Sequence, residues 1–221
     1  MPFVTAGREN SAAIRIYHED HGSGSPVVLV HGYAQNGHSW EKQEAALLAA
    51  GYRVITYDRR GFGASSRPST GYDFDTLAGD LHVLLSRLDL RDVVLAGFAM
   101  GTGEVTRYLA VHGPGRVTAA VLVAPLLPFL LKTHDNPDGV DRSVFDALTA
   151  RIAADRPAAM KDFMDRSYSV DLLAGTGSAT RRGRTASTWL SRRRRTPPSA
   201  VSPPAWKTSG PIWPRSASPS W

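Results

Sequence analysis

Short apolar runs alternate with amphipathic stretches along the first 125 residues of the chain. The runs at 26–30, 53–57 and 93–96 are rich in Val, Ile and Leu, which is typical of strands buried on both faces of a sheet. Residues 75–88 instead place leucines three and four positions apart, the spacing of an amphipathic helix. Strands that alternate with helices predict an α/β fold with a mostly parallel sheet and helices on both of its faces.

Weaker patterns fill in the rest of this alternation. We expect strands at 13–17 and 117–123, and helices at 40–50, from 101 onward, at 141–154 and at 157–166. The pattern breaks at the prolines of 125–128, and the two helices beyond them are interpreted as the start of a lid. The predicted domains are therefore an N-terminal core over 1–125 and the beginning of a lid or cap over 126–176.

Charge divides the chain unevenly. Asp171 is the last acidic residue, and the fifty residues after it carry nine of the 26 Lys and Arg. They also hold seven of the 15 prolines and four of the five tryptophans, without helix or strand periodicity. Residues 177–221 are therefore predicted to be an aberrant, basic and disordered tail, and the pI of about 9.9 belongs to this tail.

The tail becomes interpretable if the reading frame has slipped. When 205–221 is written in G/C-rich synonymous codons and regrouped, another frame gives a balanced helix that leads into an apolar strand. We therefore favour a frame slip near Thr176. On this hypothesis the arginine runs at 181–184 and 192–195 are by-products of the alternative frame, and no specific nucleic-acid partner is expected. The alternative is a basic tail that binds nucleic acid.

Other features limit the setting of the protein. The chain has no cysteine, which excludes a disulfide framework and thiol chemistry. It has no apolar run of transmembrane length and no charged-then-apolar leader, so no membrane partner is expected. These observations predict a soluble cytoplasmic protein.

The candidate chemistry lies at 97–101, Gly-Phe-Ala-Met-Gly. An apolar run precedes this pentapeptide, and a helical pattern begins at Gly101. A G-x-S-x-G turn between a strand and a helix is the nucleophile elbow of serine-dependent acyl-transfer enzymes. Ala99 stands where that serine is expected, and its methyl group cannot attack a carbonyl. The sequence therefore predicts the scaffold of such an enzyme without its nucleophile.

Further motifs extend the resemblance to a family. Residues 1 to about 176 resemble the cofactor-free, non-haem bacterial haloperoxidases of the α/β-hydrolase superfamily, also called chloroperoxidases or perhydrolases. The motifs that carry it are MPFVT at 1–5, YHEDHGSG at 17–24, VHGY at 30–33, GHSW at 37–40, YDRRGFG at 57–63, PFLLK at 128–132 and DNPDG at 135–139. The resemblance implies an α/β-hydrolase fold, here truncated before its last strands.

The resemblance also implies an activity. In such proteins a small carboxylic acid or ester acylates the serine, hydrogen peroxide releases a peracid that oxidises halide, and esterase activity accompanies this reaction. No haem, metal or other cofactor is implied. Carried over by position, the oxyanion-hole donors are the backbone N–H groups of Tyr33 and Met100. The side chains of Trp40 and Met100 are expected to wall the acyl pocket.

The partners of the nucleophile are a second departure from the family pattern. The order along the chain is serine, acid, histidine, yet His134 is the last histidine and lies too early. His112 is interpreted as a surface residue, and His31 as a support of the oxyanion loop. We therefore expect a chloroperoxidase-type chain that is catalytically inactive. The alternative is a non-catalytic relic that binds small carboxylates.

The truncation has a structural consequence. If the last strands are missing, the edge of the strand at 117–123 is bare and apolar, which favours pairing between chains. We therefore expect aggregation or chaperone binding, and the sequence leaves the oligomeric state open.

Overall fold

A computed structural model describes residues 2–126 and 130–168 of the chain. These residues fall into two compact units, Met1–Leu130 and a second that begins at Leu131. The predicted tail at 177–221, the predicted frame slip near Thr176 and the last acidic residue, Asp171, lie outside the described residues. Among the described residues, no helix is long and apolar enough to cross a membrane.

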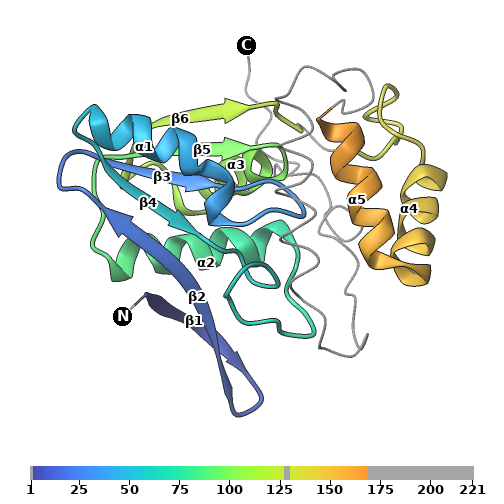
Figure 1. The fold of residues 1–221 in the computed structure, drawn as a ribbon, viewed down its shortest axis with the longest axis horizontal. Helices are drawn as coiled ribbons and strands as arrows, with labels where there is room; N and C mark the ends of the chain where they lie inside the picture. The colour runs from blue at the N-terminus through green and yellow to red at the C-terminus, as the bar shows by residue number, and fades with distance from the viewer. Residues whose placement is uncertain (1, 127–129, 169–221) are drawn as a thin grey trace. The chain divides into compact units, whose positions relative to one another are not determined.

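The first unit contains one six-stranded sheet (Figure 1). Its strands are β1 (Phe3–Glu9), β2 (Ala12–His21), β3 (Pro26–Val30), β4 (Arg53–Tyr57), β5 (Val93–Phe98) and β6 (Val117–Val123). Their order across the sheet is β1-β2-β4-β3-β5-β6. The pairs that β2 forms with β1 and β4 are antiparallel, and the other three pairs are parallel. The predicted mostly parallel sheet is confirmed.

β1 is absent from the sequence prediction, and β2 is longer than predicted. β1 is an edge strand with the polar sequence FVTAGRE, of which only Val4 is buried, so no apolar run marks it. The two strands form a hairpin that turns at Asn10, whose φ is 51°. Asparagine tolerates this left-handed conformation better than most residues.

Helices cover both faces of the sheet, as predicted. They are the short 3-10 helix η1 (Gly37–Trp40), α1 (Glu41–Ala49), α2 (Phe74–Arg87) and α3 (Met100–His112). Leu81, Leu84 and Leu85 of α2 pack with Val28, Val30 and Ile55 of the sheet in the main core cluster. On the opposite face, Leu47 and Leu48 of α1 pack against Val27, Leu29 and Val54. Alternate residues of each strand thus supply two separate cores.

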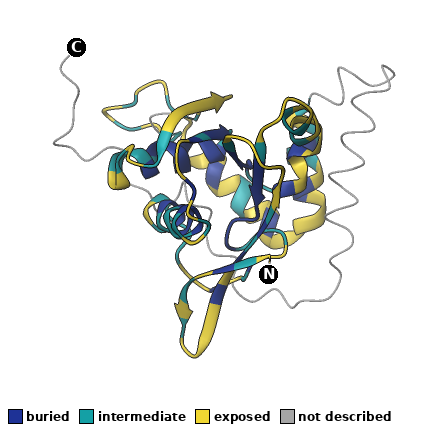
Figure 2. Ribbon diagram, turned by 90° about the vertical axis from the view of Figure 1, so that its left-hand side faces the viewer, coloured by how far each residue is buried: buried dark blue, intermediate teal, exposed yellow. Residues whose placement is uncertain are grey.

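β6 forms the outer edge of the sheet within the described part of the chain. After Val117 every residue of the strand is exposed, and Val121 is 46% exposed. Figure 2 shows the strand coloured as exposed along most of its length. Within residues 2–126 and 130–168, apolar side chains and a strand edge without a partner therefore occur together at 117–123.

The second unit contains two helices, α4 (Arg142–Ala154) and α5 (Arg156–Ser167), which match the helical pieces predicted beyond the prolines. Each begins at an aspartate cap. The Asp141 side chain accepts a hydrogen bond from Ser143 N at 2.9 Å, and the Asp155 side chain accepts one from Ala158 N at 3.1 Å. These bonds satisfy helix N–H groups that have no acceptor within the helix.

Candidate active site

The turn between β5 and α3 places Ala99 in a backbone conformation that L-residues rarely adopt. Its φ is 48° and its ψ is −114°. This pair is close to the first central position of a type II′ turn, which glycine dominates. A strained residue between a strand and a helix is the geometry of the nucleophile elbow. The elbow is therefore built here around a residue without a hydroxyl group.

Two glycines allow the elbow to form. A Cβ atom on Gly97 would lie 2.6 Å from the carbonyl oxygen of Gly101, and one on Gly101 would lie 2.4 Å from the carbonyl oxygen of Val30. Backbone atoms cannot yield at such distances, so each position excludes a side chain. The first turn of α3 is thereby packed directly against the end of β3.

Hydrogen bonds fix the peptide groups on both sides of Ala99. Its N–H donates to the Val123 carbonyl oxygen at 2.9 Å, and its own carbonyl oxygen accepts from Thr102 N at 3.0 Å. The buried Thr102 hydroxyl also donates to the Ala99 carbonyl oxygen at 2.6 Å. Sequence analysis misses Thr102, although its place three residues after Ala99 makes this bond possible. The elbow conformation is thus held without any contribution from a serine side chain.

The two residues predicted to supply oxyanion donors lie in one cluster. Met100 is the first residue of α3, so its N–H has no acceptor within the helix. The Met100 side chain is buried against Leu77, and Tyr33 and Phe74 pack against the same pair. The structure therefore brings Tyr33 and Met100 together beside Ala99.

His31 is buried completely next to this cluster. Its Nδ1 pairs with the Gly32 carbonyl oxygen at 2.8 Å, and its Nε2 accepts a hydrogen bond from Arg59 N at 3.1 Å. A carbonyl oxygen is only an acceptor, so the proton is on Nδ1 and the ring is neutral. Burial, followed by the nearby Arg59 charge, holds the pKa of His31 well below its usual value. The ring supports the loop at Gly32, as predicted.

A buried polar network, which sequence analysis also misses, links β4 to α3. Arg59 Nε lies 3.1 Å from Glu104 Oε2, and both side chains are almost completely buried. The Tyr57 hydroxyl donates to the other oxygen of the same carboxylate. Burial raises the pKa of Glu104 to about 7, while Arg59 and the hydrogen bond from Tyr57 act in the opposite direction. An acidic residue among the apolar positions of α3 is the one signal that could have indicated this network.

Of the other predicted positions, Trp40 packs against the elbow turn through Phe98, whereas the two later histidines are exposed. Trp40 is buried in the cluster under α1 and meets the Phe98 ring edge-on at 6.4 Å, whereas Met100 belongs to a different cluster. His112 is exposed at the end of α3 and stacks on His82, with ring centroids 4.2 Å apart. His134 is exposed in the second unit. Glu19, His21 and Glu44 form a separate group of side chains on β2 and α1.

Comparison with known proteins gives the same architecture. The sequence matches the family described as the alpha/beta hydrolase fold over residues 25–213. The chain belongs to this family. Within the alpha/beta hydrolases it is 63% identical to a putative non-heme chloroperoxidase of Synechocystis sp. over 175 aligned residues. These residues are 79% of this chain and 63% of that protein. It is 46% identical to a non-heme chloroperoxidase of Kitasatospora aureofaciens over 158 aligned residues, and these are 72% of this chain and 58% of that protein.

A solved structure is also similar. The crystal structure of a bromoperoxidase from Bacillus anthracis aligns with a TM-score of 0.73 and 42% identity, over 83% of this chain and 67% of that chain. Non-haem haloperoxidases of the α/β-hydrolase superfamily are therefore the relatives of this protein, as its motifs predict. The chain spans less than two thirds of the length of the curated relatives it matches.

Proposed function

We propose that this chain is a haloperoxidase-type α/β-hydrolase scaffold that does not catalyse acyl transfer. The observation that carries the proposal is the elbow at Ala99, which has the backbone conformation of a nucleophile elbow and a methyl group in place of the attacking oxygen. Nucleophilic catalysis needs an atom that forms the acyl intermediate. Without that atom, neither a small carboxylic acid or ester nor hydrogen peroxide has a reaction partner at this turn.

The proposal extends to the base that would activate a serine. His31 is the histidine beside the Tyr33–Met100 cluster, and both of its ring nitrogens are engaged by the backbone. Its low pKa also keeps it from accepting a proton near neutral pH. A serine at position 99 would therefore have the backbone conformation of a nucleophile elbow, but His31 would not act as its general base.

The test is covalent labelling with a serine-directed fluorophosphonate, combined with an assay of peracid formation from acetate and hydrogen peroxide. We expect no labelling and no peracid with the natural chain, and the same result with Ala99→Ser. Ala96→Ser, a buried substitution in β5, is the matched control for adding a hydroxyl elsewhere. Stoichiometric labelling of the natural chain or of Ala99→Ser would refute the proposal, provided a known serine hydrolase labels under the same conditions.

Binding of a small carboxylate without turnover is the second candidate. It is favoured by the first turn of α3, which contains no acidic side chain and begins at Met100 beside Tyr33. Helix N-termini attract anions through their N–H groups and the helix dipole. Titration with acetate, followed by the backbone amide NMR signals of Tyr33 and Met100, tests this candidate. Saturable shifts of both signals are expected, and unchanged signals would refute it.

A further inference from the structure

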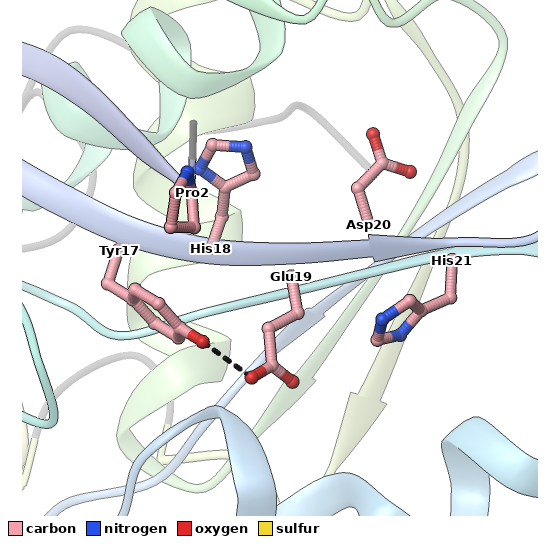
Figure 3. A pocket seen from close by; sticks show the side chains of 6 residues that line it. All are labelled: Pro2, Tyr17, His18, Glu19, Asp20 and His21. Atoms are coloured by element: carbon pink, nitrogen blue, oxygen red, sulfur yellow. Dashed lines mark hydrogen bonds between the residues drawn. The ribbon is translucent and has the colours of Figure 1, made fainter.

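Side chains of types that ligate metals lie close together on β2 and α1. Glu19 and His21 are two residues apart on β2, so they point to the same face of the sheet. Figure 3 shows their side chains on one side of the strand, with His18 and Asp20 on the other. Glu19 pairs in register with Thr56, and His21 pairs with Val54, which packs in the cluster under α1. The strand therefore presents a carboxylate and an imidazole toward this helix.

Two other elements bring further ligands to the same place. Glu44 of α1 has its Oε1 2.6 Å from Nδ1 of His21. One ligand atom each from Glu19, His21 and Glu44 can be chosen so that all three lie within 4.8 Å of one another. His38, from η1, has its Nε2 3.9 Å from Glu19 Oε1. Two imidazoles and two carboxylates are thus available at the junction of β2, η1 and α1.

The carboxylate of Glu19 is held in place by a neighbour. The Tyr17 hydroxyl donates to Glu19 Oε1 at 2.7 Å, and this hydrogen bond is the largest cause that raises the pKa of Tyr17 to about 12. Hydrogen bonds of this kind orient metal ligands, and their loss typically lowers metal affinity. The side chains of Glu19 and Glu44 are 23% and 16% exposed, so both are partly shielded from water.

An ion can reach this group from solvent because the side chains of His21 and His38 are 53% and 45% exposed. Figure 3 shows that Pro2, His18 and Asp20 lie on the other side of β2. The register of the sheet also separates the group from the elbow. His21 pairs with Val54, Val54 with Val27, and Val27 with Val94. His21 is therefore three strands away from β5 in the sheet. Along the strand direction it is in register with Val94, five positions before Ala99.

We propose that Glu19, His21 and Glu44 form a binding site for a divalent transition-metal ion, with Zn²⁺ as the best match and water as the fourth ligand. Imidazole and carboxylate ligands suit Zn²⁺, whereas Ca²⁺ and Mg²⁺ prefer oxygen ligands alone. Tetrahedral Zn²⁺ sites place neighbouring ligand atoms roughly 3.3 Å apart, given bonds of about 2.0–2.1 Å. The His21–Glu44 pair, at 2.6 Å, is closer than this value, and the three ligand atoms lie within 4.8 Å of one another. Side-chain movements of about 1–1.5 Å would therefore bring the three ligands to tetrahedral spacing.

The test is isothermal titration of the full chain with Zn²⁺, together with Co²⁺ substitution to read the geometry from its visible absorption. We expect one bound equivalent, a tetrahedral Co²⁺ spectrum, and an affinity reduced about tenfold or more in His21→Gln and in Glu44→Gln. Tyr17→Phe keeps every ligand and should lower the affinity about tenfold. Glu41→Gln, an exposed substitution in the first turn of the same helix, should leave binding unchanged.

X-ray absorption at the zinc edge gives a readout that does not depend on solubility. It should report only nitrogen and oxygen ligands at about 2.0–2.1 Å, including imidazole scattering that decreases in His21→Gln. His134→Gln removes an exposed histidine of the second unit and is the control for adventitious binding. The proposal is overturned if Zn²⁺ does not bind, if binding survives His21→Gln and Glu44→Gln, or if His134→Gln abolishes it.

Discussion

Replacing Ala99 by glycine should stabilise the protein, although the substitution removes a methyl group. The backbone at Ala99, with φ 48° and ψ −114°, is strained for any L-residue, and such strain costs about 1–3 kcal/mol. Glycine relieves it, but costs about 0.5–1 kcal/mol in the entropy of the unfolded chain. The methyl group is only partly buried, so its loss costs about 0.4 kcal/mol, half the value for a fully buried CH₂. A net stabilisation of about 1 kcal/mol follows from these opposing effects.

Pulse proteolysis across a urea gradient can measure this change. The method works at low protein concentration, which limits association through the exposed edge of β6. With a denaturant dependence of about 2 kcal/mol per molar urea, the midpoint of unfolding should rise by about 0.5 M in Ala99→Gly. This value is well above the uncertainty of a midpoint comparison between two variants.

Ala96→Gly provides the matched control. Ala96 is buried within β5, three residues before Ala99, and its φ is not positive. Here glycine relieves no strain and loses a buried methyl group, so a destabilisation of about 1.5 kcal/mol is expected. If Ala99→Gly destabilises the protein as much as Ala96→Gly does, the elbow stores no strain and the reasoning is wrong.

Three further substitutions test the sheet edge, the buried network and the elbow packing. Val121→Asp should reduce aggregation and hydrophobic-dye binding because it places a charge on the edge strand, whereas Val111→Asp, exposed on α3, should change neither. Burial raises the pKa of Glu104 from 4.5 to about 7, so the folded state holds a proton that the unfolded chain loses, and stability falls as pH rises through this window. Between pH 4.5 and 7, the free energy of unfolding of the natural chain, measured in urea, should fall by about 3 kcal/mol relative to that of Glu104→Gln. Histidine titrations are common to both proteins and cancel in this comparison. A difference between the two proteins that does not change with pH would refute the raised pKa. Gly101→Ala should destabilise the protein by about 3 kcal/mol because its Cβ meets a backbone oxygen of β3. Gly79→Ala in α2, where the space is open, should instead stabilise the protein by about 1 kcal/mol, which a higher urea midpoint would show.

The bounds of an element are predicted best where its side chains are buried on both faces of the sheet. β3 and β4 follow their apolar runs residue for residue, because a parallel strand in the middle of a sheet has no polar face. β1 is missed because it lies at the edge and buries one side chain. The elbow was predictable for a related reason. Its glycines are fixed by close contacts that any side chain at those positions would break, so the spacing itself carries the geometry.

The polar contacts were not predictable in the same way, and the difference has a physical cause. Arg59 and Glu104 meet across 45 positions of the chain, and His21 and Glu44 meet across 23. Neither pair leaves a local period, because each side chain is ordinary in its own strand, loop or helix. Their meeting is decided by sheet order, which places β4 beside β2 and β3, and by the helices that cover each face. A local motif can therefore predict the geometry of a turn from the sequence. Contacts between charged side chains on distant elements can be identified only once the order and register of the strands are known.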